Sequence, residues 1–300
     1  MKKRVIIIGG GVIARHYADG LKNSSVLEAV ALCDLNEDCP ARACFSSLPF
    51  YKDYGEAIAA LSPDAAIVAT SVKAHLPIAK DCMDKGLDVY VEKPITGSQE
   101  ELVKLYQFAQ EKGKNLTALF HWQYADEVLF LKEYLQGKKI EKIAVRIGDD
   151  YACEPLGKIR KDRLGLDGAW MDSGINALSY VHVILPLTHA RLINKLEKVD
   201  ESCGLPYFTK RVFDVDGAAL EIVVDWTDEG RKKTSELFVD GKNLHVNHSN
   251  QQVFLGEQLL YEKKVADRLA AHYQNMFYQD SIKTATVEES KLLHEILLRG

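Results

Sequence analysis

One segment near the start of the chain limits the possible folds more than any other. A short apolar run, residues 5–8, leads into Gly9-Gly10-Gly11-Val12-Ile13-Ala14, and a helical pattern over residues 12–22 follows. Gly9 permits a tight turn, Gly11 lets backbone N–H groups approach a pyrophosphate at the helix N-terminus, and Ala14 is small enough for close packing of helix on strand. The pattern predicts a dinucleotide-binding βαβ unit.

An acidic residue supports this interpretation. The strand expected at residues 26–33 ends at Asp34, about 20 residues beyond the glycine loop, where a carboxylate would accept hydrogen bonds from an adenosine ribose. It would also repel a 2′-phosphate, and the next two residues bring no guanidinium. The sequence therefore predicts NAD as the preferred cofactor. NADP stays possible because Arg15 or Arg42 could reach the same pocket, and a solvated residue at a strand end is the alternative interpretation of Asp34.

The first 120 or so residues alternate short apolar runs with helical patterns, which is typical of a parallel sheet covered by helices on both faces. Strands are expected at residues 5–8, 26–33, 65–69, 89–91 and 116–120, with a weak one near Phe50, and helices at 12–22, 54–61, 74–85 and 98–112. We therefore expect an α/β Rossmann domain, a doubly wound parallel sheet, over residues 1–122.

After Tyr124 the pattern changes. A helix is expected at residues 126–136, a strand at 142–148, an irregular stretch at 150–171, and strands at 190–199, 207–214, 218–225, 235–240, 244–248 and 252–255. Asp216-Gly217 and Asp240-Gly241 are hairpin signals. Residues 123–300 are thus predicted to form an α+β domain with a mainly antiparallel open sheet, and two closing helices, near 263–279 and 287–298, to pack back on the body of the protein, the first domain included.

Charge and cysteine content exclude several classes of protein. Lys and Arg number 38 against 43 Asp and Glu, a net charge of -5, so a nucleic-acid partner is not expected. The six cysteines form no Cys-x-x-Cys pair and show no metal-ligand spacing, which predicts reduced thiols, a cytoplasmic location and no metal site.

The basic start followed by residues 5–8 resembles a signal peptide but lacks a small-residue cleavage site, and no stretch reaches the ~20 apolar residues of a membrane helix.

The strand at residues 89–91 delivers Glu92-Lys93-Pro94 at its carboxyl end, the edge along which open α/β sheets bind ligands. An ammonium there could lie beside a nicotinamide, donate a hydrogen bond to a substrate oxygen and shuttle a proton. On the tripeptide alone, an exposed lysine at a strand end is an equal alternative.

Three segments together resemble the glucose–fructose oxidoreductase / inositol dehydrogenase / rhizopine-catabolism (Gfo/Idh/MocA) family: Gly9 to Ala14, Ala69-Thr70 through His75 before a helix, and Val91-Glu92-Lys93-Pro94. With the antiparallel second domain, the resemblance covers essentially the whole chain. It implies that Lys93 is the central catalytic and substrate-binding lysine. Residues that would then contact the cofactor are Gly9, Gly10, Gly11, Val12, Ile13, Asp34, Thr70, His75, Glu92 and Lys93.

The same family carries an Asp-x-Gly-x-His element that opens a helix of the second domain. Here the segment reads Asp172-Ser173-Gly174-Ile175-Asn176, so Asp172 matches the acid and Asn176 replaces the histidine. The resemblance therefore leaves Lys93 and Asp172 as the acid–base pair. Asp172 and Asn176 are four apart and would share one helix face, whereas helix capping by Asp172 or Ser173 is the alternative. The Asp-x-Gly-Ile-Asn-Ala-Leu form resembles the aldose 1-dehydrogenase branch that acts on galactose or arabinose.

Further contacts to a substrate are expected from His121 and Trp122 at the domain junction, from Trp226, and from Tyr151, Glu154, Arg160 and Trp170 in or beside the irregular stretch. A histidine at the junction could bond a sugar hydroxyl, and structural packing is an equal alternative for it. The role of Trp226 in lining a sugar pocket is implied by the resemblance of Val224-Asp225-Trp226 to the aldose branch.

The resemblance implies an NAD-linked aldose 1-dehydrogenase that oxidises the C1 hydroxyl of a neutral cyclic sugar to a lactone by hydride transfer. An inositol dehydrogenase, or oxidation at another sugar carbon, is the nearest alternative. Reduction of a non-sugar carbonyl or imine and a non-enzymatic NAD-binding regulator follow. A homodimer or homotetramer is expected because one face of the open sheet must be covered.

Overall fold

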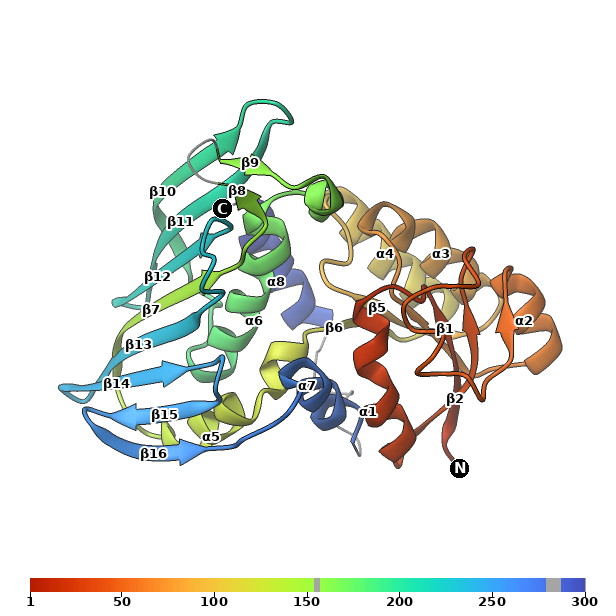
Figure 1. The fold of residues 1–300 in the computed structure, drawn as a ribbon, viewed down its shortest axis with the longest axis horizontal. Coiled ribbons are helices and arrows are strands. Elements are labelled where there is room, and N and C mark those ends of the chain that lie inside the picture. Colours follow the sequence, from red (N-terminus) through yellow and green to blue (C-terminus); the bar gives the residue numbers. More distant parts are fainter. Residues whose placement is uncertain (154–156, 279–286, 300) are drawn as a thin grey trace. The chain divides into compact units, whose positions relative to one another are not determined.

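The computed structural model describes residues 1–153, 157–278 and 287–299 (Figure 1). The chain divides into two compact units. The first unit comprises Met1–Tyr124 and Asp267–Lys291, and the second comprises Ala125–Ala266 and Leu292–Gly300. The first unit thus takes in residues from the C-terminal part of the chain.

The first unit is built on a six-stranded sheet of order β3-β2-β1-β4-β5-β6, in which every neighbouring pair is parallel (Figure 1). Its strands are β1 (Lys3–Ile8), β2 (Leu27–Cys33), β3 (Phe50–Tyr51), β4 (Ala65–Val68), β5 (Asp88–Glu92) and β6 (Leu116–Leu119). This is the strand order of dinucleotide-binding sheets, and it reverses direction between β1 and β4. The predicted doubly wound Rossmann fold is confirmed.

The helices of the first unit are η1 (Ile13–Tyr17), α1 (Ala18–Asn23), α2 (Tyr54–Leu61), α3 (Val72–Asp84), η2 (His121–Tyr124), α4 (Gln99–Lys112) and, from the C-terminal part, α7 (Arg268–Phe277). Local signals set their ends: the Asp53 carboxylate accepts the Gly55 N–H at 2.6 Å at the start of α2, and α4 ends at Gly113 with φ +64°. The helix predicted at 12–22 is a 3₁₀ turn, η1, that continues as α1.

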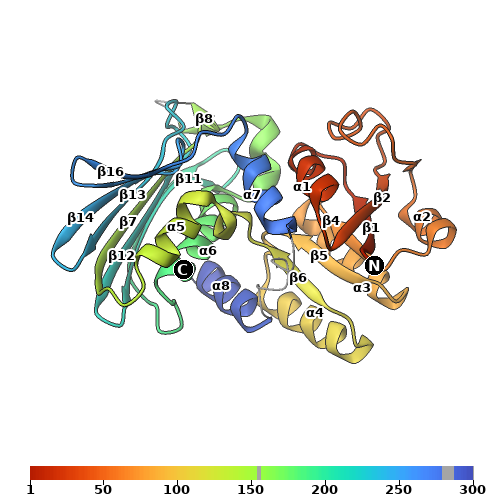
Figure 2. The ribbon, with the colours of Figure 1, turned by 90° about the horizontal axis from the view of Figure 1, so that it is seen from below.

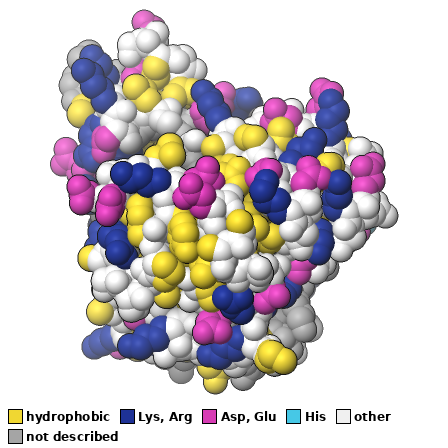
Figure 3. Space-filling view, turned by 90° about the vertical axis from the view of Figure 1, so that its right-hand side faces the viewer, with side chains coloured by type: hydrophobic (Ala, Val, Ile, Leu, Met, Phe, Trp, Pro, Cys, Tyr) yellow, Lys and Arg dark blue, Asp and Glu magenta, His cyan; other side chains and the backbone are white. Residues whose placement is uncertain are grey.

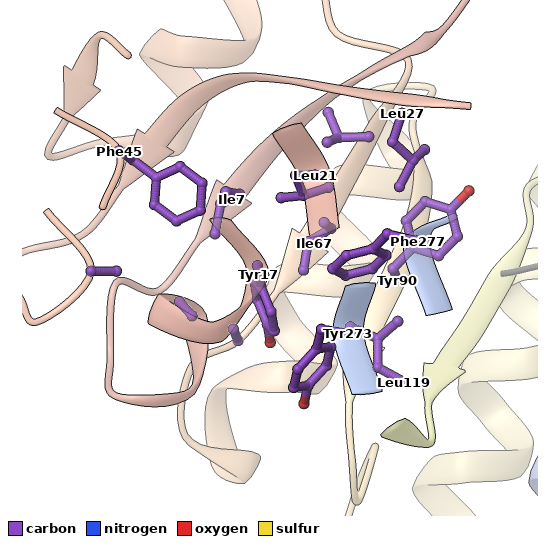
Figure 4. Packing of buried hydrophobic residues seen from close by; sticks show 14 of the residues in the cluster. Ile7, Tyr17, Leu21, Leu27, Phe45, Ile67, Tyr90, Leu119, Tyr273 and Phe277 are labelled. Atoms are coloured by element: carbon purple, nitrogen blue, oxygen red, sulfur yellow. The ribbon is translucent and has the colours of Figure 1, made fainter. Parts of the chain in front are cut away.

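Helix α7 packs into the core of the first unit (Figure 4). The Tyr17 ring meets the Tyr273 ring edge-on at a centroid distance of 4.7 Å and the Phe277 ring at 5.7 Å. Gly20 on α1 permits this approach, because a Cβ at that position would lie 2.7 Å from the Tyr273 carbonyl oxygen. The predicted helix at 263–279 begins only at Arg268, since Asp267 caps it by accepting the Ala270 N–H at 3.1 Å.

The second unit is built on an eight-stranded sheet of order β10-β11-β12-β7-β13-β14-β15-β16. All neighbouring pairs are antiparallel except β12 and β7, so the predicted mainly antiparallel sheet is confirmed. Its strands are β7 (Ile140–Gly148), β10 (Arg191–Asp200), β11 (Leu205–Val215), β12 (Ala218–Asp225), β13 (Lys233–Val239), β14 (Lys242–Asn247), β15 (Gln252–Leu255) and β16 (Gln258–Glu262).

Helices α5 (Asp126–Tyr134) and α6 (Ile175–Ile184) and the end of α8 (Val287–Arg299) lie on one side of this sheet (Figure 2). Buried residues alternate along β12, where Leu220, Ile222 and Val224 point inward and are fully buried. The predicted hairpins are confirmed: Asp216 and Gly217 have φ +51° and +87°, and Asp240 and Gly241 have φ +49° and +73°. Two consecutive residues with positive φ are the mark of the type I′ turn that suits twisted strands.

The stretch predicted as irregular contains short regular elements. These are the paired strands β8 (Ala152–Cys153) and β9 (Lys158–Ile159), a 3₁₀ helix η3 (Lys161–Leu166) and a π-helical turn η4 (Trp170–Gly174) that leads directly into α6. Strand β16 was not predicted. The pairings of β8 with β9 and of β15 with β16 depend on strands that are neighbours in space, and a local apolar pattern does not indicate them.

The described residues contain neither a membrane-spanning helix nor a cluster of metal ligands. None of the helices at 1–153, 157–278 and 287–299 combines the length and the apolar character that a membrane crossing requires. In the same ranges no three His, Cys, Asp or Glu side chains gather as a metal site would demand. On the face shown in Figure 3, Lys and Arg side chains are interspersed with Asp and Glu side chains.

Candidate active site

The glycine loop after β1 has the geometry of a phosphate cradle. Gly9 has φ +101°, and a Cβ there would lie 2.5 Å from the Ala69 carbonyl oxygen, so only glycine fits. A Cβ at Gly10 would lie 2.3 Å from the Cys39 Sγ. At Gly11, by contrast, a Cβ would meet no atom of the described residues within 4 Å, its two chain neighbours aside. The loop therefore leaves open space over Gly11, next to the start of η1, where a pyrophosphate could approach the backbone.

Asp34 links the end of β2 to this loop. Its Oδ2 accepts the Gly10 N–H at 2.6 Å, and its Oδ1 accepts the Asn36 N–H at 2.8 Å. Each carboxylate oxygen has a second lone pair, so the group can still accept a hydroxyl hydrogen. Arg42 is engaged elsewhere: its Nη1 donates to the Phe45 carbonyl at 3.1 Å and its guanidinium lies 5.5 Å from the Phe50 ring.

His75 contacts backbone carbonyl groups just beyond the ends of two neighbouring strands, β4 and β5. Its Nδ1 lies 3.1 Å from the Pro94 carbonyl oxygen, and its Nε2 lies 3.1 Å from the Thr70 carbonyl oxygen. Burial lowers the pKa of His75, so the ring is neutral at pH 7 and donates to only one of them. The Thr70 Oγ1 is buried and has no hydrogen-bond partner among the described residues, which marks it as a group able to bind a ligand.

Glu92, at the end of β5, is buried and faces two tyrosines. Its Oε1 accepts the Tyr17 hydroxyl at 2.7 Å and the Tyr273 hydroxyl at 2.6 Å, and its Oε2 lies 3.2 Å from the Lys93 backbone nitrogen. Burial, and then the charge of Glu92, raises the pKa of both tyrosines well above the ordinary value. Lys93 itself is half-buried, and its peptide bond to Pro94 is cis.

His121 lies in the same unit, directly after β6. Its Nδ1 is 3.1 Å from the His272 Nδ1, and the two rings stack with a centroid distance of 5.4 Å. Burial holds the pKa of His121 well below its usual range, and the positive charges of Lys93 and Arg268 lower it further. A neutral histidine is therefore brought close to Lys93, with one Nδ1 of the histidine pair donating to the other.

Trp122 follows His121 in η2 and is almost fully buried. The Arg268 guanidinium of α7 lies 5.9 Å from its ring. A cation over a tryptophan face is a favourable contact within about 6 Å. Trp122 is therefore part of the packing of α7 in the first unit.

In the second unit, Asp172 and Asn176 lie one turn apart across η4 and α6. The Asn176 Nδ2 donates to the Asp172 carbonyl at 3.4 Å, while the Asn176 Oδ1 is buried without a hydrogen-bond partner among the described residues. Among the described residues, no side chain caps η4 or α6, because the helical backbone already begins before Asp172. The capping alternative for Asp172 and Ser173 is therefore wrong.

Tyr151 lies near Asp172 in the second unit. Burial raises the pKa of Tyr151 to about 12, and the negative charges of Asp149 and Asp172 contribute. Its ring meets the Trp226 ring edge-on at 5.5 Å and lies under the Arg163 guanidinium at 4.4 Å. Trp226 is fully buried, and its indole nitrogen has no hydrogen-bond partner among the described residues.

Of the remaining candidates, Trp170 donates its indole N–H to the Leu297 carbonyl at 2.8 Å, which anchors η4 to α8. Arg160 pairs with Asp150 at 3.3 Å. Glu154 lies outside the described residues. Tyr17, His272 and Tyr273 had no prediction as site residues: the closing helix near 263–279 was expected to pack back on the first domain, but no local motif indicates which of its side chains reach Glu92 and His121.

The comparisons with known proteins agree with this geometry. Residues 3–120 match the family model of an oxidoreductase family with an NAD-binding Rossmann fold (Gfo/Idh/MocA). Glycosyl hydrolase family 109 protein 2 of Akkermansia muciniphila is 31% identical over 147 residues, which are 45% of this chain and 31% of that protein. D-glucoside 3-dehydrogenase of Escherichia coli is 25% identical over 211 residues, 67% of this chain and 60% of that protein. The chain thus spans 31% of the length of the first relative and 60% of the second.

Solved structures match the chain over nearly its whole length. An oxidoreductase from Agrobacterium radiobacter in complex with NAD⁺, L-tartaric acid and magnesium has a TM-score of 0.80 at 12% identity and covers 99% of this chain and 94% of its own. A myo-inositol dehydrogenase from Corynebacterium glutamicum has a TM-score of 0.77 at 15% identity, with 99% and 95% covered. These likenesses show the fold of both units. Residues 3–120 are thereby similar to the NAD-binding Rossmann domain of the Gfo/Idh/MocA oxidoreductase family.

Proposed function

We propose that the protein is an NAD(P)-dependent dehydrogenase that acts on a CH–OH group of a sugar or polyol, and specifically an aldose 1-dehydrogenase that converts a cyclic aldose to its lactone. The observation that carries the proposal is the pairing, within one unit, of a glycine cradle that is open over Gly11 with Lys93 at the carboxyl end of β5. Ligands of open α/β sheets bind along this edge.

The residues of the cradle fit a dinucleotide. Gly9 to Ile13 would hold the pyrophosphate, the Asp34 carboxylate the adenosine ribose, and the buried Thr70 Oγ1 a further polar group. When bound, the nicotinamide supplies the hydride acceptor. NAD is preferred over NADP because Asp34 would repel a 2′-phosphate and because the Arg42 guanidinium is held by the Phe45 carbonyl.

Side chains of the protein bind the substrate and accept the proton that it loses. Lys93 donates a hydrogen bond to the reacting hydroxyl and polarises it, and the Asp172 carboxylate provides the acceptor for the proton that the oxidation releases. The Asn176 Oδ1, which has no hydrogen-bond partner among the described residues, accepts a hydrogen bond from a sugar hydroxyl. Without this bond a buried acceptor would stay unsatisfied. Neutral His121 is available as a hydrogen-bond partner for a further hydroxyl, since its low pKa keeps it from adding a second positive charge beside Lys93.

A second candidate is oxidation at another ring carbon, either C3 of a sugar or an inositol carbon. The relative that matches 67% of this chain is named D-glucoside 3-dehydrogenase, and another relative, 28% identical over 160 residues, is named inositol 2-dehydrogenase/D-chiro-inositol 3-dehydrogenase. Both reactions use the same cofactor and proton handling, and only the orientation of the ring differs.

The experiment that tests the proposal follows NADH and NADPH formation with free aldoses, their methyl glycosides, inositols and sugar acids. A methyl glycoside has no free C1 hydroxyl but keeps the C3 hydroxyl. Turnover of an aldose but not of its methyl glycoside supports C1 oxidation, and turnover of both supports the second candidate. Absence of turnover across the panel, with tight NADH binding, refutes both.

The assembly and location are also proposed. Ile193, Leu196 and Val199 on edge strand β10 are 54%, 54% and 44% exposed, which supports a homodimer or homotetramer that covers this sheet. Analytical ultracentrifugation tests the oligomeric state, and a monomer would contradict this proposal.

All six cysteines are free thiols, which supports a cytoplasmic location.

A further inference from the structure

Two tyrosines from opposite ends of the chain bind one buried carboxylate beside Lys93. Tyr17 comes from η1 and Tyr273 from α7, and both donate to the same oxygen of Glu92, at 2.7 and 2.6 Å. Glu92 is 5% exposed, and both tyrosines are fully buried. Figure 4 shows the Tyr17 and Tyr273 side chains side by side, with their hydroxyls pointing the same way.

This arrangement holds the carboxylate in one place. Hydrogen bonds from hydroxyls to a carboxylate are short and about twice as strong as neutral ones, and a buried carboxylate without donors is costly. Because the pKa of Tyr17 and of Tyr273 is raised well above the ordinary value, both remain protonated donors through the neutral range. Two donors on Oε1 also fix the rotamer of Glu92.

The other oxygen of Glu92 faces Lys93. Its Oε2 lies 3.2 Å from the Lys93 backbone nitrogen, so the rotamer of Glu92 influences the backbone of the first residue after β5. The donors are themselves rigidly placed. Gly20 lets α7 lie directly against α1, and Asp267 at the start of α7 contacts both the Ala270 N–H, at 3.1 Å, and the His16 Nδ1, at 2.8 Å.

We propose that Tyr17 and Tyr273 are positioning residues for the reaction: by holding Glu92 they fix Lys93, so that helix α7 is a working part of the active site in the first unit. The inference rests on the proposed function, in which Lys93 is an acid–base group. A displacement of about 1 Å in such a group can reduce turnover about 100-fold.

The kinetic test removes one hydroxyl at a time. Tyr273→Phe should lower kcat about tenfold, and Tyr17→Phe/Tyr273→Phe about 100-fold, while the KM for the substrate and the Kd for NADH stay within about twofold. Tyr106→Phe is the matched control, because Tyr106 on α4 is also buried in the first unit and does not contact Glu92; its kcat should be unchanged. Circular dichroism confirms that each variant is folded.

An outcome in which the folded double variant keeps the kcat of the wild type overturns the inference and leaves the proposed function standing. Equal losses in the double variant and in Tyr106→Phe also overturn it, since they would reflect a general loss of core packing. If the wild-type protein turns over no substrate of the panel, the proposed function fails, and the inference falls with it.

A second test needs no substrate. In protein labelled with 3-fluorotyrosine, the ¹⁹F resonances of Tyr17 and Tyr273 are assigned by their absence in the two phenylalanine variants. Glu92→Gln should shift both resonances, because it replaces the charged acceptor of their hydrogen bonds, and should leave the Tyr106 resonance in place. Unshifted Tyr17 and Tyr273 resonances would show that these hydroxyls do not hold Glu92, which overturns the inference.

Discussion

Gly9 and Gly11 lie two residues apart in the same loop, yet alanine should have opposite consequences at the two positions. At Gly9 a Cβ would meet the Ala69 carbonyl oxygen at 2.5 Å, in a backbone with φ +101°. At Gly11 a Cβ would meet no atom in the part of the chain that the structure describes, its chain neighbours aside, within 4 Å, and the backbone is not left-handed. Gly9 is therefore required by the fold, whereas Gly11 is required only by a ligand that occupies the open space.

The expected magnitudes follow from these contacts. Gly9→Ala combines an unfavourable φ, about 1–3 kcal/mol, with an overpacked contact to backbone that cannot move aside, again about 1–3 kcal/mol. We expect its free energy of unfolding to fall by about 3 kcal/mol. Gly11→Ala should keep or raise this free energy by up to about 1 kcal/mol, since alanine reduces the entropy of the unfolded chain. Lost hydrogen bonds from backbone N–H groups to a charged phosphate, about 1.5–3 kcal/mol, should weaken NADH binding about 10- to 100-fold.

Urea unfolding of both variants without cofactor measures the first quantity, and titration of NADH fluorescence measures the second. Gly9→Ala is the matched control, because it disturbs the fold of the loop without placing a methyl group over Gly11. Wild-type NADH affinity in Gly11→Ala would refute the placement of the pyrophosphate over Gly11. A loss of stability in Gly11→Ala as large as in Gly9→Ala would show that the space is not open.

Three further predictions concern single residues. Lys93→Ala should lower turnover about 10²- to 10⁴-fold in an NADH-formation assay and leave NADH binding nearly intact; undiminished turnover would remove Lys93 from the mechanism. Asp34→Ala should weaken NAD binding and raise the ratio of kcat/KM with NADP to that with NAD, and a constant ratio would contradict the ribose contact. Because burial lowers the pKa of His121, the unfolded chain binds more protons below pH ~6.5, so the free energy of unfolding should fall as pH drops from 7 to 5, by up to about 1.4 kcal/mol per pH unit from this group. Urea unfolding should show a flatter pH dependence in His121→Asn, and equal slopes would refute this.

Most of the first unit could be predicted from the sequence because its signals are local. Apolar runs mark the buried parallel strands, and the glycine loop and Asp34 are each recognisable from residue type and spacing. The Gly10 N–H donates to the Asp34 carboxylate at 2.6 Å, which connects the glycine loop with the acidic residue after β2, although the two are recognised separately in the sequence. The position of Lys93 at the end of β5 also follows from the strand before it.

What could not be predicted depends on contacts distant in sequence. Tyr273 reaches Glu92 across 181 residues, and His272 reaches His121 across 151. Neither pair has a spacing or a periodicity that identifies it. The π-helical turn that carries Asp172 had no signal either, because a helix without a capping side chain offers no start residue to recognise. Residues of this kind are positioned by packing, which the chain reveals only once it is folded.

We propose that hydride passes from C1 of an aldose to a nicotinamide held at the edge of the parallel sheet. The most direct measurement uses an aldose with deuterium at C1 and detects the label in the reduced cofactor by mass spectrometry. Deuterated NADH is expected from the wild-type protein, at a rate that falls at least about 100-fold in Lys93→Ala. Unlabelled NADH would place the oxidation at another carbon, and no NADH from any aldose would refute oxidation of an aldose at C1.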